Sequence, residues 1–172
     1  MEIRSATEHD LPELLAIYND VIATSTAVFA TAPATLDDRR TWMRDRQAAG
    51  YPVLVAMSDE NVTGFASFAE FRGAWNGYRY SVEHSVHVHS GARGHGVGNA
   101  LVQALFPRAI ELGKHVMIGG IDAANVASLR LHERLGFERV ALLPEVGRKF
   151  GHWIDLVFMQ KLLDERGSAR AD

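Results

Sequence analysis

Hydrophobic and polar residues alternate strictly between Tyr80 and His89, which is the pattern of a half-buried strand. One face of this predicted strand carries Tyr80, Val82, His84, Val86 and Val88. The opposite face carries Ser81, Glu83, Ser85, His87 and His89. A run of glycines follows between Gly91 and Gly98, after which apolar residues return at helical spacing. The pattern predicts a strand, a glycine-rich turn and a helix, in that order.

The rest of the chain is predicted from the same periods and from capping residues. Further strands are expected at residues 2–6, 51–57, 62–71, 115–121, 137–144 and 152–162. Helices are expected at residues 11–22, 35–50 and 125–135, and from the glycine turn to residue 112. Pro107 is expected to kink or break the helix after the glycine turn, and Gly147 and Gly151 are expected in the link between the last two strands. The order β-α-α-β-β-β-α-β-α-β-β predicts an α/β (α+β) fold, a mixed sheet covered by helices.

Composition restricts the classes of function. With 172 residues and 47% hydrophobic content, the chain predicts one domain over residues 1–163 and a flexible tail over 164–172. The net charge of −3 and the absence of a basic block argue against a nucleic-acid surface. The absence of cysteine excludes disulfides, thiolate metal sites and an acyl-cysteine intermediate. No signal peptide or membrane-length apolar run is recognised, which predicts a cytoplasmic protein without a membrane partner.

The glycine turn has the chemistry of a phosphate site. Backbone N–H groups left free in such a turn, together with the positive end of the helix dipole, attract a phosphate-bearing ligand. A Walker loop does not fit because Val97, not lysine, follows Gly96. A dinucleotide fingerprint starting at Gly94 would need glycine in place of Asn99. The pattern that does fit is R-x-x-G-x-G over residues 93–98.

A second motif, N-x-x-S-x-x-L-H-E-x-x-G-F, occupies residues 125–137. Together the two motifs resemble the pyrophosphate loop and the second CoA-contacting segment of the GNAT N-acetyltransferases, and the resemblance covers residues 3–163. It is closest to the branch that acetylates phosphinothricin and methionine sulfoximine. That closer match lies in S-V-E-H-S-V at residues 81–86, S-L-R-L-H-E at 128–133 and K-F-G-H-W-I-D at 149–155.

The resemblance implies the GNAT fold, with a mixed, mostly antiparallel twisted sheet of about seven strands flanked by about four helices. It also implies acetyl-CoA as co-substrate, no metal, and direct acetyl transfer in a ternary complex within a homodimer. The implied acceptor is the α-amine of a small glutamate-like amino acid: methionine sulfoximine, methionine sulfone or phosphinothricin. A protein N-terminus, a polyamine, an antibiotic amine or a non-catalytic acyl-CoA sensor are the alternatives.

The resemblance also assigns residues to roles. Those assigned to acetyl-CoA are Val86, His87, Val88, Arg93, Gly94, His95, Gly96, Val97, Gly98, Asn99, Asn125 and Ser128. Those assigned to the amine substrate are Phe29, Arg72, Gly73, Ala74, Trp75, Glu83, His84 and Ser85. Glu83 is the implied catalytic base. His132 stands where many members of the family carry a tyrosine that protonates the departing thiolate.

Several of these residues also have ordinary structural explanations. A lone Glu on a polar strand face is usually solvated, although an amine that attacks a thioester must lose a proton and Glu83 is the only carboxylate of its strand. Phe29 fits a plug over the core as well as a pocket wall, and His132 fits a packed helix histidine. His87 and His89 share a face and suit a metal ion, but no third ligand has a recognisable spacing, so a zinc hydrolase is only a rival interpretation.

Overall fold

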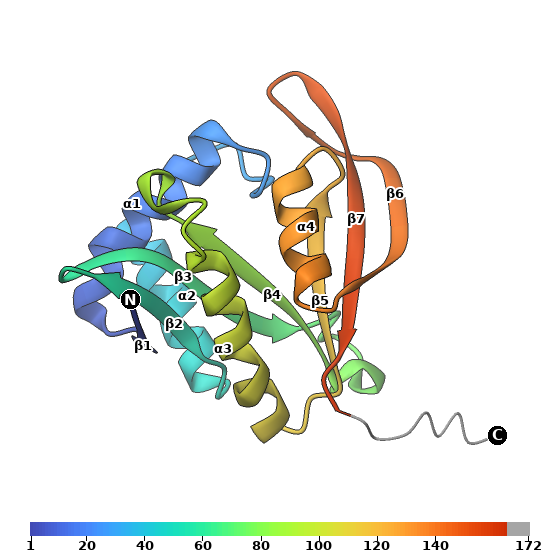
Figure 1. Cartoon of the computed structure of the whole chain (residues 1–172), viewed down its shortest axis with the longest axis horizontal. Coiled ribbons are helices and arrows are strands. Elements are labelled where there is room, and N and C mark those ends of the chain that lie inside the picture. Colours follow the sequence, from blue (N-terminus) through green and yellow to red (C-terminus); the bar gives the residue numbers. More distant parts are fainter. Residues whose placement is uncertain (165–172) are drawn as a thin grey trace.

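A single seven-stranded sheet organises residues 1–164, the part of the chain that the computed structural model describes (Figure 1). Its spatial order is β1-β2-β3-β4-β5-β7-β6. The strands are β1 (Glu2–Ser5), β2 (Val53–Ser58), β3 (Asn61–Glu70), β4 (Ser81–Val88), β5 (Val116–Asp122), β6 (Glu138–Lys149) and β7 (His152–Leu162). The helices are α1 (Leu11–Thr24), α2 (Leu36–Ala48), α3 (Val97–Glu111) and α4 (Val126–Arg134). The predicted order of elements is confirmed, whereas the predicted tail falls mainly outside the described residues.

The helix starts follow from capping side chains. Thr7 and Asp10 form a capping box around a short 3-10 turn before α1, and Thr35 forms another with Asp38 before α2. The side chain of Asn125 accepts a hydrogen bond from the Ser128 amide at the start of α4. These contacts satisfy amides that have no partner within the helix, which explains why short polar residues marked the boundaries correctly.

The two faces of the sheet are covered by different helices. Leu54 and Ala56 pack with α3 and α4 in one apolar cluster, which contains Leu101, Leu105 and Leu129. Val53 and Val55 point to the other face and pack with residues of α1 and α2. Because successive side chains of a strand point to opposite faces, β2 contributes to both clusters. In α1 the buried stripe includes Ile17 and Val21.

The sheet is divided where β4 meets β5, its one parallel pair in the described chain. Pairing there is confined to Ser81–Glu83 of β4 and Val116–Ile118 of β5. Beyond these residues the two strands separate (Figure 1), while β4 stays paired with β3 and β5 stays paired with β7. The later part of β4 therefore presents a backbone edge that no described strand covers.

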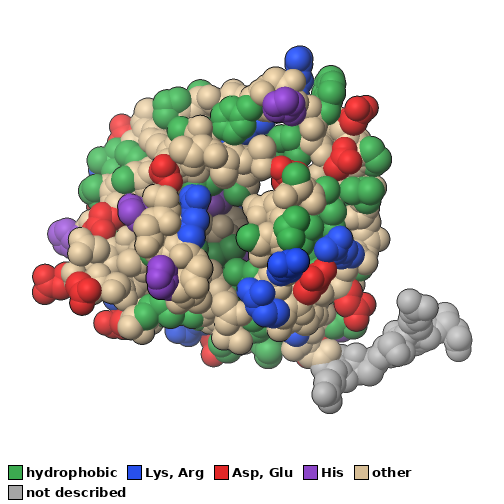
Figure 2. Space-filling model, turned by 45° about the horizontal axis from the view of Figure 1, so that its top comes forward, with side chains coloured by type: hydrophobic (Ala, Val, Ile, Leu, Met, Phe, Trp, Pro, Cys, Tyr) green, Lys and Arg blue, Asp and Glu red, His purple; other side chains and the backbone are tan. Residues whose placement is uncertain are grey.

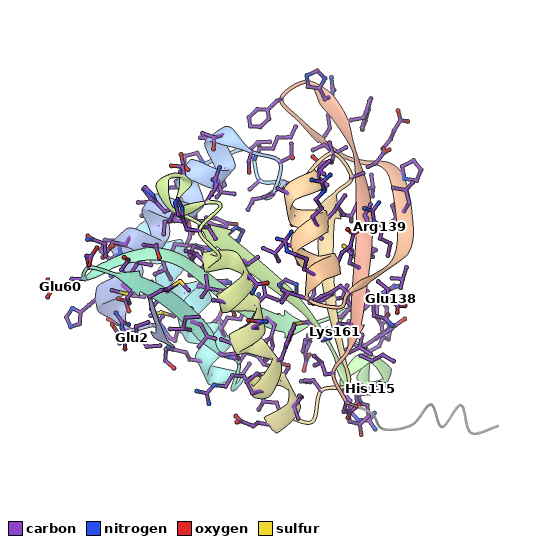
Figure 3. The ribbon with its side chains drawn as sticks, in the orientation of Figure 1. Glu2, Glu60, His115, Glu138, Arg139 and Lys161 are labelled. Atoms are coloured by element: carbon purple, nitrogen blue, oxygen red, sulfur yellow. The ribbon has the colours of Figure 1, made fainter. Side chains whose placement is uncertain are left out.

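The outer hairpin differs from the prediction, and of the kink or break predicted at Pro107 the break does not occur. Strand β6 continues through Gly147 to Lys149, with irregular register after Leu143, so only Gly151 lies in the link. Arg139 extends from this outer strand and forms a salt bridge of 2.8 Å with Glu133 of α4 (Figure 3). The helix α3 runs through Pro107 without a break. Pro107 removes one backbone donor from the helix. The helix continues because residues on both sides of Pro107 pack on the sheet.

Candidate active site

A cleft of about 980 Å³ lies where β4 and β5 separate. Its walls come from the later part of β4, the glycine turn, the start and one face of α4, the end of α1 with the segment after it, and Phe150 at the tip of the β6–β7 hairpin. Figure 2 shows the hollow, with Lys and Arg side chains beside it. The cleft thus joins the two sequence motifs, which lie on α3 and α4, across the divided sheet.

The glycine turn has the backbone geometry of an anion site. Gly94 and Gly96 have φ values of +81° and +83°, and a Cβ on either would meet open space. Gly96 is the N-cap of α3. Among the hydrogen bonds of residues 1–164, none is donated by the amides of residues 94–99. Free amides at a helix N-terminus fit the pyrophosphate of an acyl-CoA.

Gly98 serves a different purpose from Gly96. A Cβ on Gly98 would lie 3.1 Å from Cδ1 of Leu131 and 3.5 Å from Cγ2 of Val88. The missing side chain therefore lets α3 approach α4 and β4 closely, which is a packing requirement rather than a direct approach to a ligand.

Charged side chains flank the glycine turn. Arg93 lines the cleft, and its Nε donates to the Val88 carbonyl at 3.3 Å while its guanidinium lies 3.6 Å from Asp20. Arg134 of α4 also lines the cleft, although sequence reasoning had missed it. Of the predicted cofactor residues only His95 lies outside the lining. Two guanidinium groups on the lining of the cleft that the glycine turn also lines suit an anionic ligand.

Glu83 is paired with Ile118 of β5, and its carboxylate extends to Gly120, two residues further along that strand. A Cβ on Gly120 would be 3.1 Å from Oε1 of Glu83, so the glycine provides the room that the carboxylate occupies. Partial burial raises the pKa of Glu83 above its ordinary value, although the side chain keeps access to solvent. The position is just where pairing of β4 with β5 ends, so a carboxylate stands at the mouth of the divided sheet.

On the other face, His84 and His132 are buried together. Their Nε2 atoms are 3.1 Å apart, and Nδ1 of His132 is 2.7 Å from the Ser128 carbonyl. Because a carbonyl only accepts, Nδ1 of His132 carries the proton; in the neutral ring Nε2 then accepts from Nε2–H of His84. Burial lowers both pKa values, that of His84 to about 3. Gly119 makes room for both imidazoles.

This arrangement places His132 behind the wall of the cleft rather than in it. The residue is 2% exposed and does not line the cleft, whereas Ser128 does. The hydroxyl of Ser128 is 3.5 Å from Nδ1 of His132. A group in the cleft therefore meets Ser128 before it meets His132.

His87 does not behave as a polar-face residue. It is 8% exposed, and its ring packs against Tyr18 and Phe65 with centroid distances of 5.5 and 5.0 Å. Burial lowers its pKa to about 4. His89, the other histidine considered for a metal site, accepts a hydrogen bond from the Gly91 amide at 3.1 Å through Nδ1. No cluster of three or more metal-ligating side chains occurs within residues 1–164.

The predicted substrate residues all lie outside the cleft lining. Besides Glu83, His84 and Ser85 on β4, they occupy two places. Arg72, with a φ of +51°, stacks over Trp75 at 5.1 Å and over Tyr78 at 5.5 Å. The ring of the preceding Phe71 packs against that of Phe158. A Cβ on Gly120 would meet both Phe158 and Glu83, so the loop lies on the same face of the sheet as Glu83. Gly73 packs on Glu70.

Phe29 occupies the second place, on the outer hairpin. A Cβ on Gly147 would be 2.6 Å from Cε2 of Phe29, so the ring rests on the glycine backbone. The segment just before Phe29 lines the cleft, and Thr26 hydrogen-bonds Asp122 there. Sequence reasoning missed Asp122 and Phe150 as lining residues because neither belongs to a periodic pattern; the K-F-G-H-W-I-D motif was the available signal for Phe150.

Comparison with known proteins identifies relatives over nearly the whole chain. The Acetyltransferase (GNAT) family model matches residues 14–137. The chain is 47% identical over 168 residues to the L-methionine sulfoximine/L-methionine sulfone acetyltransferase of Pseudomonas aeruginosa, covering 97% of each protein. It is 36% identical over 166 residues to the phosphinothricin N-acetyltransferase of Streptomyces coelicolor, covering 95% of this chain and 96% of that protein.

Solved structures agree with this match. A Salmonella typhimurium acetyltransferase determined with its cofactor acetyl-CoA superposes with a TM-score of 0.93 at 44% identity, over 99% of this chain and 98% of the other. A ribosomal-protein-alanine N-acetyltransferase from Brucella melitensis superposes with a TM-score of 0.92 at 47% identity, over 94% of this chain and 99% of the other. Within residues 1–164 no helix is both long and apolar enough to cross a membrane.

Proposed function

The chain belongs to the GNAT family of acetyltransferases, and from this premise we propose that it acetylates the α-amine of a small glutamate-like amino acid. The proposed acceptors are methionine sulfoximine, methionine sulfone and phosphinothricin, in keeping with the names of the relatives. The observation that carries the proposal is the cleft at the divided sheet, where free amides meet the uncovered edge of β4; the Glu83 carboxylate lies outside its lining, at the point where β4 and β5 separate. Acetylation of a toxic amino acid's amine would confer resistance to it.

Acetyl-CoA is the acetyl donor, and its binding residues are proposed from the cleft. The amides of residues 94–99, with Arg93 and Arg134, would hold the phosphates. The uncovered backbone from Val86 to Val88 would pair with the amides of the pantetheine arm, as an added strand pairs with a sheet edge. Asn125 and Ser128 face the same space from α4.

Glu83 is the proposed base. A protonated α-amine cannot attack a thioester, and a carboxylate of raised pKa is a better acceptor of its proton than an ordinary one. The proton passes to Glu83 directly or through water, the amine nitrogen forms the new bond to the acetyl carbon, and the bond from that carbon to sulfur breaks. A backbone N–H near Val86 would stabilise the developing oxyanion.

The departing thiolate needs a proton, which we assign to His132 acting through Ser128. The hydroxyl of Ser128 is 3.5 Å from Nδ1 of His132, and Ser128 lines the cleft. It would donate its proton to sulfur and take one from the imidazolium form of His132, which leaves that ring neutral. His84, paired with the opposite nitrogen, keeps the His132 ring in this orientation.

Arg72 is the proposed partner of the substrate's acidic groups. Its planar guanidinium suits a carboxylate or phosphinate, and its loop lies on the same face of the sheet as Glu83. Gly73, Ala74 and Trp75 belong to the same loop, and Ser85 and His84 flank the reacting position along β4. Phe29 would form the apolar wall.

A homodimer in the cytoplasm is also part of the proposal. The outer strand β6 and its hairpin carry apolar side chains that are each more than half exposed: Val140, Leu142, Val146 and Trp153. Such a surface on an edge strand favours a partner, and a second copy gives closed two-fold symmetry. Sedimentation of the wild-type protein and of Leu142→Glu tests this, because the dimer should dissociate in the variant.

Release of CoA in the presence of acetyl-CoA and a panel of amines tests the activity. The panel contains the three proposed amino acids, unmodified methionine and glutamate, a peptide beginning with alanine, and a polyamine. The proposal expects the highest kcat/KM for the sulfone, sulfoximine or phosphinate compounds. A preference for the peptide or the polyamine would keep the acetyltransferase assignment and reject this substrate class.

A further inference from the structure

The segment after α1, residues 25–28, crosses from the α1 side of the molecule to the β5 side (Figure 1). We call these residues the strap. Three of them, Ser25, Thr26 and Ala27, line the cleft. The hydroxyl of Thr26 donates to Asp122 at the end of β5, so the strap contacts the far wall directly. The strap contains no helix or strand, so its position depends on such contacts.

Lys149 makes the strongest of these contacts. Its Nζ donates to the carbonyls of Ser25 and Val28, both at 2.7 Å, and the residue is 4% exposed. None of the ion pairs within residues 1–164 includes it. A buried ammonium without a carboxylate is costly, and it persists where backbone oxygens replace its water. Burial lowers its pKa accordingly.

A steric contact two residues earlier on β6 fixes the adjoining side chain. Phe29 follows the strap, and its ring lies on Gly147, where a Cβ would come within 2.6 Å. Lys149 and Gly147 therefore act on consecutive parts of one loop. Lys149 binds the carbonyls of the strap, and Gly147 contacts the aromatic ring of Phe29. The tip of the same hairpin places Phe150 in the cleft lining.

We propose that Lys149 is a positioning residue that fixes the strap and Phe29 on the β5 side of the cleft, where they bound the space left for the amine, and thereby determines which amines are accepted. The inference rests on the proposed acetyl transfer. Within residues 1–164 the hydrogen bonds of Lys149 go to Ser25 and Val28 and none goes to residues 94–99, so binding of acetyl-CoA should depend little on it. Misplacement of a substrate wall by about 1 Å can reduce turnover by up to about a hundredfold.

The test compares Lys149→Met, Lys149→Arg and Gly147→Ala with wild type, and uses Lys161→Met as the matched control on β7. Hydrogen–deuterium exchange of residues 24–35 is measured first, because it needs no substrate. Lys149→Met should accelerate exchange there and leave β4 unchanged, whereas Lys149→Arg should have a smaller effect. Lys161→Met should resemble wild type.

Kinetics with the best acetylated amine complete the test. In Lys149→Met and Gly147→Ala the KM for the amine should rise about tenfold, whereas the KM for acetyl-CoA should change less than about twofold. Equal changes in both KM values, faster exchange throughout the chain, or unaltered strap exchange would overturn the inference. If no amine of the panel is acetylated by wild type, the proposed function fails, while the exchange data still decide whether Lys149 fixes the strap.

Discussion

The Nε2 atom of His84 lies 3.1 Å from the Nε2 atom of His132, and both rings are buried beside Gly119. The strand β4 and the helix α4, which lie on either side of the separation between β4 and β5, thus share a hydrogen bond within the core. His84→Leu would leave the bare nitrogen of His132 buried without a donor, which should reduce the free energy of unfolding by about 1–3 kcal/mol. Urea denaturation of His84→Leu, of His132→Leu and of the double variant measures this loss. Fully additive losses would argue against the hydrogen bond.

Stability should decline as the solution becomes acidic. The pKa values of His84, His87 and His132 are lowered in the folded protein, so below their unfolded value of about 6.5 the unfolded chain binds more protons than the native chain does. The free energy of unfolding should therefore fall from pH 6.5 toward pH 4. His87→Phe should make the slope shallower by at most about 1.4 kcal/mol per pH unit. A slope unaffected by His87→Phe contradicts the assignment.

The glycine turn predicts a specific loss of acetyl-CoA affinity. Gly96→Ala forces a Cβ onto a residue with φ of +83° whose amide faces the proposed phosphates, so the KM for acetyl-CoA should rise tenfold or more, about 1.4 kcal/mol. Gly50→Ala is the matched control, because its φ of +77° brings similar strain far from the cleft. It should lower thermal stability to a similar extent and leave the KM unchanged. Equal KM values in the two variants would reject the phosphate site.

Glu83→Gln keeps the side chain's size and removes its basicity. The kcat at pH 7 should fall by about 10²–10⁴ and recover partly at high pH as free amine accumulates. In wild type, activity should be lost as pH falls through the pKa of Glu83, which burial has raised, so the acidic limb should lie above the range of an ordinary carboxylate. A pH–rate profile of both proteins checks this, and wild-type kcat in the variant at every pH would make Glu83 a bystander.

Arg72→Lys keeps the charge but loses the guanidinium fork. The KM for the amino acid should rise about tenfold with little change in that for acetyl-CoA, because paired hydrogen bonds to a carboxylate or phosphinate are lost. Arg79→Lys, in the same loop and stacked over Tyr80 at 4.4 Å, is the control. If both variants show the same KM for the amino acid, Arg72 has no special role.

The fold was predictable because its signals are local. Capping residues such as Thr35 and Asn125, and the strict alternation along β4, depend only on near neighbours in the chain. The same alternation misassigned His87, since the sequence does not reveal that Tyr18 and Phe65 cover the second face of β4. It also ended β6 too early, because Gly147 resembles a turn residue until Phe29 is placed against it.

Site residues that belong to a sequence motif could be predicted, whereas residues brought to the cleft by the packing of distant segments could not. The glycine turn and Asn125 came from motifs and lie together in the cleft. By contrast, Asp122, Arg134 and the strap enter the cleft only through the packing of distant segments. His132 came from a motif, yet its distance from the cleft depends on its hydrogen bonds to His84 and to Ser128.

Among the residues that the structure describes, β4 and β5 join the two parts of the sheet by strand pairing at three positions, from Ser81 with Val116 to Glu83 with Ile118. A ligand whose amides bind along the uncovered edge of β4 would therefore be part of what holds the two parts together. Because such a ligand binds the folded chain and not the unfolded one, saturation at a hundred times Kd adds about 2.7 kcal/mol to the free energy of unfolding. The lifetime of this protein against proteolysis should then rise and fall with the supply of acetyl-CoA, which couples its abundance to the metabolic state of the cell.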